Sequence, residues 1–182
     1  MALVKYGQSF KTMAITINGT GTLTGVSVGG LPDGIVDRDT LAAQAKGSIL
    51  QTVYGYTTTQ VTNNTNTYAD TGLTATITPS STSNKILILA SLNCCQKNNS
   101  TYLRVRCLRG STELAKIDDG SGYTDDSSNN IVGSICLSGQ DSPNTTSATT
   151  YKLQFHSGAN ISATLVQVNQ ALSSILLLEV AG

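Results

Sequence analysis

The chain of 182 residues has no tryptophan, few other aromatic residues and few charges. Aromatic residues make up 5% and charged residues 12%, and 11 basic residues balance 11 acidic ones. A neutral chain has no electrostatic attraction for nucleic acid or an anionic membrane, so we expect neither partner. The strongest apolar runs, 86–90 and 175–178, fall far below the roughly 18 residues that indicate a membrane span. The sequence therefore predicts no membrane insertion.

Residues able to carry catalysis are also scarce. The segment 25–29 matches the Gly-x-Ser-x-Gly pattern of a nucleophile elbow, but that motif needs a strand, a tight turn and a helix around it. Here it lies in a glycine-rich stretch, and its only candidate base is the single histidine, His156, which we place on the polar face of a strand. We predict a protein that is not an enzyme and has no cofactor.

Metal ligands are weakly indicated. Cys94, Cys95, Cys107 and Cys136 lack the two-residue spacing of a zinc site, and we predict reduced thiols, mostly buried in strands. The segment 118–126 holds four carboxylates, yet its spacing is not that of a calcium-binding EF-hand loop. We predict no metal and assign this segment to an exposed loop with a contact role. The expected contact residues are Tyr123, Asp125 and Asp126 in this segment and the nearby Asn129 and Asn130.

Two regions of the chain differ in texture. Residues 1–48 are rich in glycine and hold one brief strand, 14–17, and one short helix, 40–46, which are typical of an extended arm rather than of a core. Residues 49–182 alternate apolar and polar residues, as in 73–78, 103–107 and 151–156. Such short strands separated by turns favour an antiparallel β-sandwich. The predicted fold is all-β, a jelly-roll-like sandwich preceded by the arm.

Two segments break this alternation. Residues 86–89 and 175–178 are apolar on both faces of a strand, whereas a sandwich strand has one core face. No helix is expected in this region to cover the second face, so we expect another subunit to cover it. The residues assigned to this oligomer interface are Ile86, Ile88, Leu176 and Leu178.

Several segments of the sequence are similar to segments of known proteins. Residues 13–34, MAITINGTGTLTGVSVGGLPDG, resemble the N-terminal leader of many virion proteins of aquatic, cyanophage-type bacteriophages, which are described as tail-fibre-like. Segments 77–88, 141–151 and 174–182 fit the same group. One departure is that residues 1–12 precede the leader, so that Met1 and Met13 are both candidate starts.

The resemblance implies a structural protein of a phage particle, assembled in the host cytoplasm and located in the virion. We expect a short trimeric tail fibre or appendage, docked on another virion protein by residues 1–48 and presenting residues 49–182 for attachment to the host, where a surface glycan is a candidate partner. The alternatives are a capsid decoration protein or head fibre, and a free lectin-like module. The expected anchoring residues are Ile15, Ile17, Leu23, Val26 and Val28.

Overall fold

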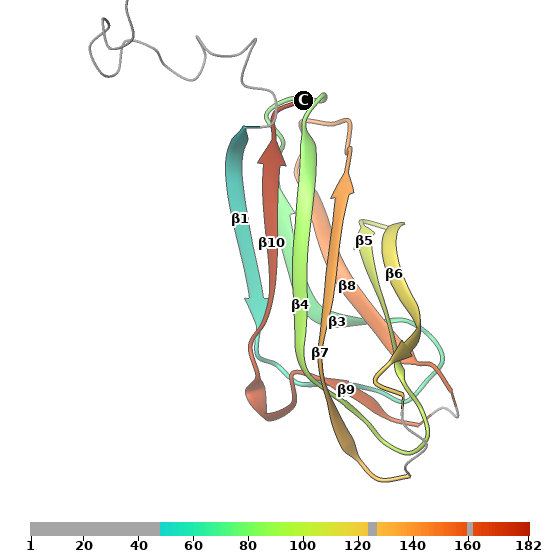
Figure 1. The fold of residues 1–182 in the computed structure, drawn as a ribbon. Helices are drawn as coiled ribbons and strands as arrows, with labels where there is room; N and C mark the ends of the chain where they lie inside the picture. Colours follow the sequence, from blue (N-terminus) through green and yellow to red (C-terminus); the bar gives the residue numbers. More distant parts are fainter. Residues whose placement is uncertain (1–47, 124–126, 160–161) are drawn as a thin grey trace, which may run out of the picture. The chain divides into compact units, whose positions relative to one another are not determined.

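Two antiparallel β-sheets face each other in the computed structural model, which describes residues 48–123, 127–159 and 162–182 (Figure 1). The predicted antiparallel β-sandwich is therefore confirmed for this part of the chain. The predicted arm lies outside the described residues, and so do its expected strand, its helix and the anchoring residues Ile15, Ile17, Leu23, Val26 and Val28.

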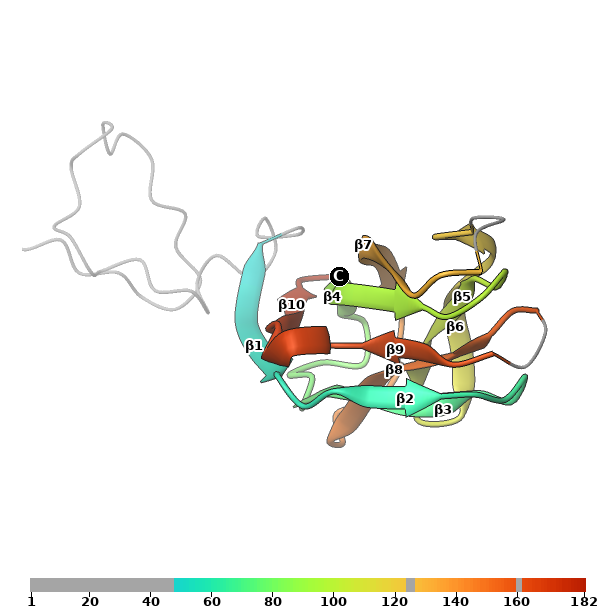
Figure 2. The same ribbon diagram turned by 90° about the horizontal axis from the view of Figure 1, so that it is seen from below.

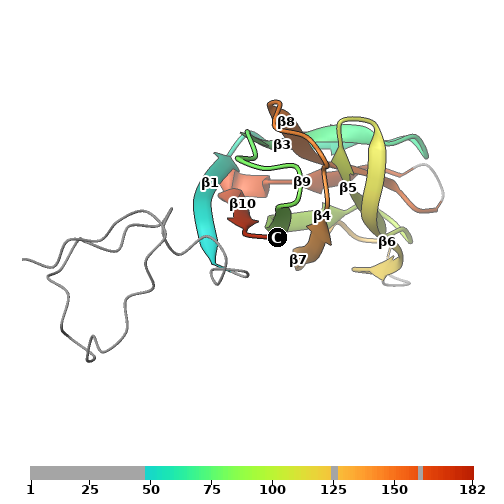
Figure 3. The same cartoon turned by 90° about the horizontal axis from the view of Figure 1, so that it is seen from above.

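The larger sheet has the strand order β1-β10-β4-β9-β2, and β7 pairs with β4 beside this path. Its strands are β1 (Ile49–Thr57), β10 (Ser173–Val180), β4 (Lys85–Lys97), β9 (Thr164–Val166), β2 (Val61–Asn63) and β7 (Asn130–Asp141). The smaller sheet has the order β3-β8-β5-β6, with β3 (Ala69–Ile77), β8 (Thr149–Ser157), β5 (Leu103–Arg109) and β6 (Thr112–Ser121). The one helical element of the described residues is a 3-10 turn, η1 (Val168–Gln170). Figure 3 shows the sheets from the end that carries the C-terminus.

The core forms where the apolar faces of the two sheets meet. Successive side chains of a strand point to opposite faces, so alternate residues of each strand enter the same core. The fully buried residues come mainly from β3, β5 and β8 of the smaller sheet and from β4 and β10 of the larger one; they include Leu73, Val105, Phe155, Ile86 and Ile175. Burying each such side chain contributes about 1.5–3 kcal/mol. The alternation predicted for 73–78, 103–107 and 151–155 is confirmed.

Gly55 brings β1 close to the smaller sheet. A Cβ at this position would lie 2.2 Å from the Thr74 carbonyl oxygen, so a larger residue would force the two strands apart. In β4, Cys94 has a φ of 44°, and the pairing with β7 shifts register at this point. This bulge separates the first part of β4, which pairs with β10, from its last residues, which pair with β9.

The start of β1 and the C-terminus lie at the same end of the sandwich. The Ala181 amide donates to the Ser48 carbonyl at 2.9 Å, and the Gly182 amide donates to Asn84 Oδ1 at 3.1 Å. At the opposite end, Figure 2 shows β2 and β9 side by side. Here the Gly158 amide donates to the Tyr102 carbonyl at 2.8 Å, which ties the connection after β8 to the one after β4. The start of β1 and these long connections therefore lie at opposite ends of the sandwich.

A buried carboxylate fastens the C-terminal strand to the connection between β3 and β4. Glu179 is fully buried and accepts hydrogen bonds from Asn84 Nδ2 at 2.6 Å, from Gln51 Nε2 at 2.5 Å and from the Ser80 amide at 2.6 Å. Burial by itself raises the pKa of Glu179, but these hydrogen bonds outweigh it and hold the pKa below its usual value. Neutral donors thus stabilise this charge inside the fold.

Candidate functional site

The outer face of the larger sheet is uncharged in its central rows and exposes leucine and tyrosine side chains. The strand register aligns its outward residues in rows that cross β1, β10, β4 and β7. Three successive rows are Thr52, Leu178, Leu87 and Gln140; Tyr54, Leu176, Leu89 and Ser138; and Tyr56, Ser174, Ser91 and Cys136. Every residue of these rows is uncharged and is exposed or half-buried. We call these three rows the apolar face.

The apolar face combines a ridge with a groove. Tyr54 and Tyr56 of β1 are 56% and 65% exposed, and their rings stack with centroids 6.0 Å apart. Beside them lies a groove of about 390 Å³. Its walls are the Tyr54 ring together with leucine and small residues of the other three strands: Leu89, Ala90, Ser91, Cys136, Leu137, Ser138, Ser174 and Leu176. A shallow uncharged groove of this kind fits an apolar side chain.

The four predicted interface residues fall on different sides of the larger sheet. Leu176 and Leu178 are half-buried on the apolar face. Ile86 and Ile88 are 0% and 3% exposed and fill the core of the chain itself, so their assignment to the interface is wrong. In a strand that is apolar on both sides, periodicity identifies two faces but does not say which one points inward. Leu89, which is 49% exposed, is the outward residue that the sequence interpretation missed.

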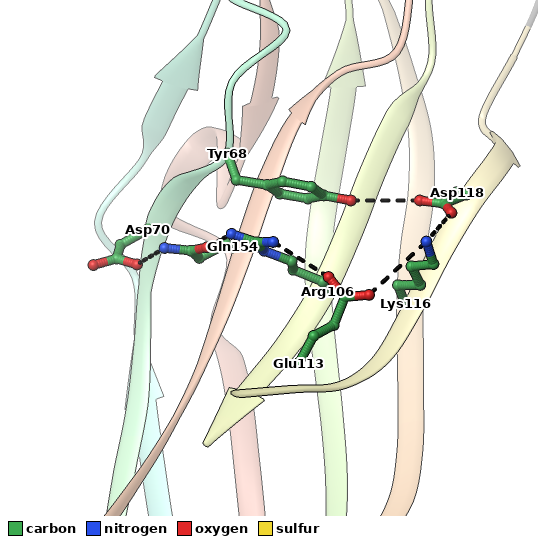
Figure 4. Close-up of polar contacts among 7 residues, drawn as sticks. All are labelled: Tyr68, Asp70, Arg106, Glu113, Lys116, Asp118 and Gln154. Carbon is green, nitrogen blue, oxygen red and sulfur yellow. Dashed lines mark hydrogen bonds and ion pairs between the residues drawn. The ribbon is translucent and has the colours of Figure 1, made fainter. Parts of the chain in front are cut away.

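The outer face of the smaller sheet carries charges that pair with one another (Figure 4). Arg106 on β5 lies over the Tyr68 ring, with the guanidinium carbon 3.9 Å from the ring centroid. Its Nη2 donates to Gln154 Oε1 at 2.7 Å and its Nη1 donates to Glu113 Oε2 at 3.2 Å. Gln154 in turn donates to Asp70 Oδ1 at 2.7 Å. We call this outer face, with these residues and the Lys116–Asp118 pair, the polar face.

The pKa shifts on the polar face follow from these pairs. Lys116 Nζ lies 2.6 Å from Asp118 Oδ2, and its hydrogen bond holds the pKa of Asp118 below the usual value. Burial and the Asp118 charge raise the pKa of Tyr68. The charges of Arg106, Glu113, Lys116 and Asp118 are thus paired on a partly solvated surface.

The predicted contact loop is shorter than the sequence indicated. Asp118 belongs to β6, and Asn130 begins β7, so the assignment of both to a loop is wrong. Tyr123 is 50% exposed, its ring lies 6.1 Å from that of Tyr102, and Asn129 is exposed. Asp125 and Asp126 lie outside the described residues. Among residues 48–123, 127–159 and 162–182, the structure groups no three His, Cys, Asp or Glu side chains that could hold a metal ion.

His156 lies on the polar side of β8, as predicted, but it is buried there rather than exposed to solvent. The side chain is 5% exposed, its Nδ1 lies 2.7 Å from the Ser157 carbonyl oxygen, and its ring packs edge-on against Tyr68 at 4.3 Å. The alternation ends here because Phe155, His156 and Ser157 are all covered at the end of β8. Tyr68, from the connection between β2 and β3, packs on the imidazole from the side that water would occupy.

All four cysteines are free. Cys95 and Cys107 are buried in β4 and β5, and burial raises their pKa to about 12 and about 11. Cys136 is exposed on the apolar face, which the sequence interpretation did not foresee. Its thiol therefore lies in the groove, where its reactivity can be used to measure access to the groove.

The described helical structure includes no segment long and apolar enough to cross a membrane. Comparison of the chain with models of protein families found no match, and comparison with curated proteins found none either.

Proposed function

We propose that this protein is a non-enzymatic structural component of a phage virion, a short trimeric fibre or appendage that is docked by residues 1–48 and presents residues 49–182 outward. The assignment to a phage particle is supported by the resemblance to tail-fibre-like virion proteins, which covers residues 13–34, 77–88, 141–151 and 174–182. The observation that carries the proposal is the apolar face, because contiguous exposed apolar patches often mark surfaces of contact between proteins.

The finer fold in this proposal is a jelly roll. Its support is the strand order: β1-β10-β4-β7 in one sheet opposes β3-β8-β5-β6 in the other. In both sheets, strands that are distant in sequence alternate with each other, as in two interlocked Greek keys. Viral shells and lectins use such double sheets. In this view β2 and β9 are an added pair at the end opposite the C-terminus.

The arrangement of the two ends supports separate anchoring and presenting parts. Residue 48 and the C-terminus lie at one end, whereas the connections that follow β4, β6 and β8 lie away from it (Figure 1). An anchor at the first end leaves the second free for a host surface, where Tyr123 and Asn129 are exposed. Loops placed at one end of a rigid sandwich are a common location for recognition.

The test is incorporation of a protein that lacks residues 1–48 into particles during phage assembly. We expect the shortened protein to remain a folded oligomer and to be absent from purified virions, while the full chain is incorporated. Incorporation at the level of the full chain would contradict docking by this segment. Copy number per particle then separates a fibre, with a few to tens of copies, from a decoration protein, with hundreds.

A further inference from the structure

β1 is the strand through which the N-terminal part of the chain joins the sandwich. It begins at Ile49, opposite Val180 near the end of β10. It ends at Thr57, opposite Ser173 at the start of β10. Because the two strands are antiparallel, residue 48 and the C-terminus lie at the same end of the sandwich (Figure 1). A pull on the chain before residue 48 therefore acts first on the start of β1.

One ladder of hydrogen bonds holds β1 in the larger sheet. Within the described residues β1 pairs only with β10, along its whole length from Ile49 to Thr57. The hydrogen bonds of an antiparallel ladder lie perpendicular to the strands. A force that drags β1 lengthwise past β10 therefore loads many of these bonds at once, which we call shearing. A force that separates the two strands at one end loads the bonds one after another, which we call peeling.

Side-chain contacts near the start of β1 add to the ladder. Gln51 Nε2 donates to Glu179 Oε2 on β10 and also to the Thr78 carbonyl oxygen at 2.7 Å. The first bond joins β1 to the buried carboxylate, and the second joins β1 to the connection between β3 and β4. Lengthwise movement of β1 would break both bonds together with the ladder.

Gly55 gives a steric reason why β1 resists sliding. A Cβ at this position would lie 2.2 Å from the Thr74 carbonyl oxygen, so β1 approaches β3 too closely here for any side chain. Movement of β1 towards residue 48 would bring Tyr56, and then Thr57, to the place of Gly55. The close approach to β3 therefore opposes shearing, whereas it does not hinder the separation of β1 from β10 at the end that carries residue 48.

β1 is the strand that should leave the sandwich first under load. Its residues are exposed or half-buried, whereas Ile175 and Leu177 of β10 are fully buried in the core. β10 is also paired on both sides, with β1 and with β4. The contact between β1 and β10 is therefore the weakest link between residue 48 and the rest of the sandwich.

We propose that the β1–β10 ladder, with the Gln51 contacts and the close approach at Gly55, is a mechanical clamp. It resists a pull on residue 48 against the opposite end of the sandwich, which shears the ladder. It opens easily when residue 48 and the C-terminus are pulled apart, which peels the ladder. The clamp is a property of the sandwich, but its role rests on the proposed function: a protein anchored by residues 1–48 and bound to a host at its other end is loaded by shearing.

The test compares the two pulling directions on the full chain with optical tweezers. The first handle is attached at residue 1 in both cases. For peeling, the second handle follows Gly182. For shearing, the exposed Asn129 is replaced by a residue that carries an azide for the second handle. Asn129 precedes β7, whose first residue pairs with Lys97 at the end of the sheet opposite the start of β1. Unlabelled full chain in the chamber keeps the tethered copy in its associated state.

We expect the opening force to be at least about twofold higher for shearing than for peeling at one loading rate, because shearing loads the ladder bonds together. Forced unfolding depends on the barrier to unfolding, so the same fold can give two forces. Equal opening forces in the two directions would overturn the clamp.

A pair of variants assigns the resistance to β1. Gln51→Ala removes the bonds to Glu179 and Thr78 and should lower the shearing force. Thr76→Ala removes a hydrogen bond to Thr150 between β3 and β8, away from the ladder, and should leave the shearing force unchanged. If both variants lower the shearing force equally, the resistance reflects the stability of the whole sandwich, and its assignment to β1 is wrong.

The outcomes for the clamp and for the proposed function are distinguishable. If shearing and peeling differ as expected while a chain without residues 1–48 still joins particles, the clamp is supported and docking by this segment is wrong. If the shortened chain is excluded from particles while the two forces are equal, docking is supported and the clamp is wrong.

Discussion

The two outer faces of this sandwich are built on the same kind of strand and differ in nearly every other respect. On the polar face, Arg106, Gln154 and Asp70 bind one another and leave the surface charged and solvated. On the apolar face, tyrosine and leucine side chains stand exposed with no charge among them. Because both faces are equally far from the core, folding alone does not demand this difference. We attribute the difference to the proposed oligomer, in which the larger sheet would bury a second surface.

The largest difference between the two outer faces should appear when a charge is placed on each of them. Leu176→Lys puts an ammonium group at the centre of the apolar face, and burying it without a partner costs several kcal/mol. We expect a loss of the oligomer, measured as a fall in mass by light scattering. Thr76→Lys, the matched change on the outer face of the smaller sheet, should leave the mass unchanged. An oligomer that tolerates Leu176→Lys would contradict the role given to this face.

Substitutions at two adjacent residues of β4 should affect folding and assembly separately. Ile88 is 3% exposed in the core, and Ile88→Ala should lower the free energy of unfolding by about 3 kcal/mol because it leaves a cavity. Leu89→Ala should lower the unfolding free energy of the monomer by less than about 1 kcal/mol. Its main effect should be to weaken the association of copies. Urea unfolding at low protein concentration measures the first effect, and sedimentation at several concentrations measures the second. Equal losses of unfolding free energy would show that the two sides of β4 are not distinct.

Glu179 lies on β10 between two outward residues but points inward, so its charge should affect folding and not assembly. Glu179→Gln keeps the size of the side chain and presents an amide to donors, which should cost about 1–3 kcal/mol at pH 7. The folded-state pKa is lowered, so the carboxylate stabilises the fold above its usual pKa of 4.5 and loses this effect as the pH falls through that value and below.

The measurement for Glu179 is the difference in unfolding free energy between the two proteins from pH 7 to pH 3. We expect this difference in unfolding free energy to become smaller in acid. Protonation removes the charge of Glu179 from the unmodified protein at low pH, whereas the substitution removes that charge at every pH. A difference that stays constant across this range would show that the charge of Glu179 is not what stabilises the fold.

The smallest effect belongs to the polar face. Arg106→Met keeps an apolar stem on Tyr68 but removes the hydrogen bonds to Gln154 and Glu113. Because the side chains are partly solvated, we expect a loss of unfolding free energy of about 1 kcal/mol or less, reduced further by salt, and no change in mass. Urea unfolding at low and high salt measures it. A change in oligomeric state would mean that the polar face also takes part in assembly.

How far the sequence predicts this molecule depends on the strand. In β3, β5 and β8 one side is apolar and the other polar, so alternation identifies the core side of Leu73, Val105 and Phe155. In β4 both sides are apolar, and only the pairing register decides that Ile88 points inward and Leu89 outward. The sequence therefore identified Leu176 and Leu178 as members of the apolar face, but in β4 it selected the inward residues Ile86 and Ile88 instead of Leu89.

Other features depend on contacts between distant residues. Glu179 follows Ile175 and Leu177 at the inward period-two positions, a signal for a buried carboxylate, but its donors come from 51 and from 80–84. His156 is buried where the distant Tyr68 packs edge-on against its ring, and no local pattern encodes that contact. The ridge and groove likewise arise only when β1, β10, β4 and β7 align.

The most direct test of the central claim, that the apolar face is covered by other copies of this chain, is the mass of the unmodified protein across protein concentration. Light scattering coupled to size exclusion should give about three times 18.9 kDa at tens of micromolar and shift towards 18.9 kDa on dilution. A mass of 18.9 kDa throughout this range would contradict the account.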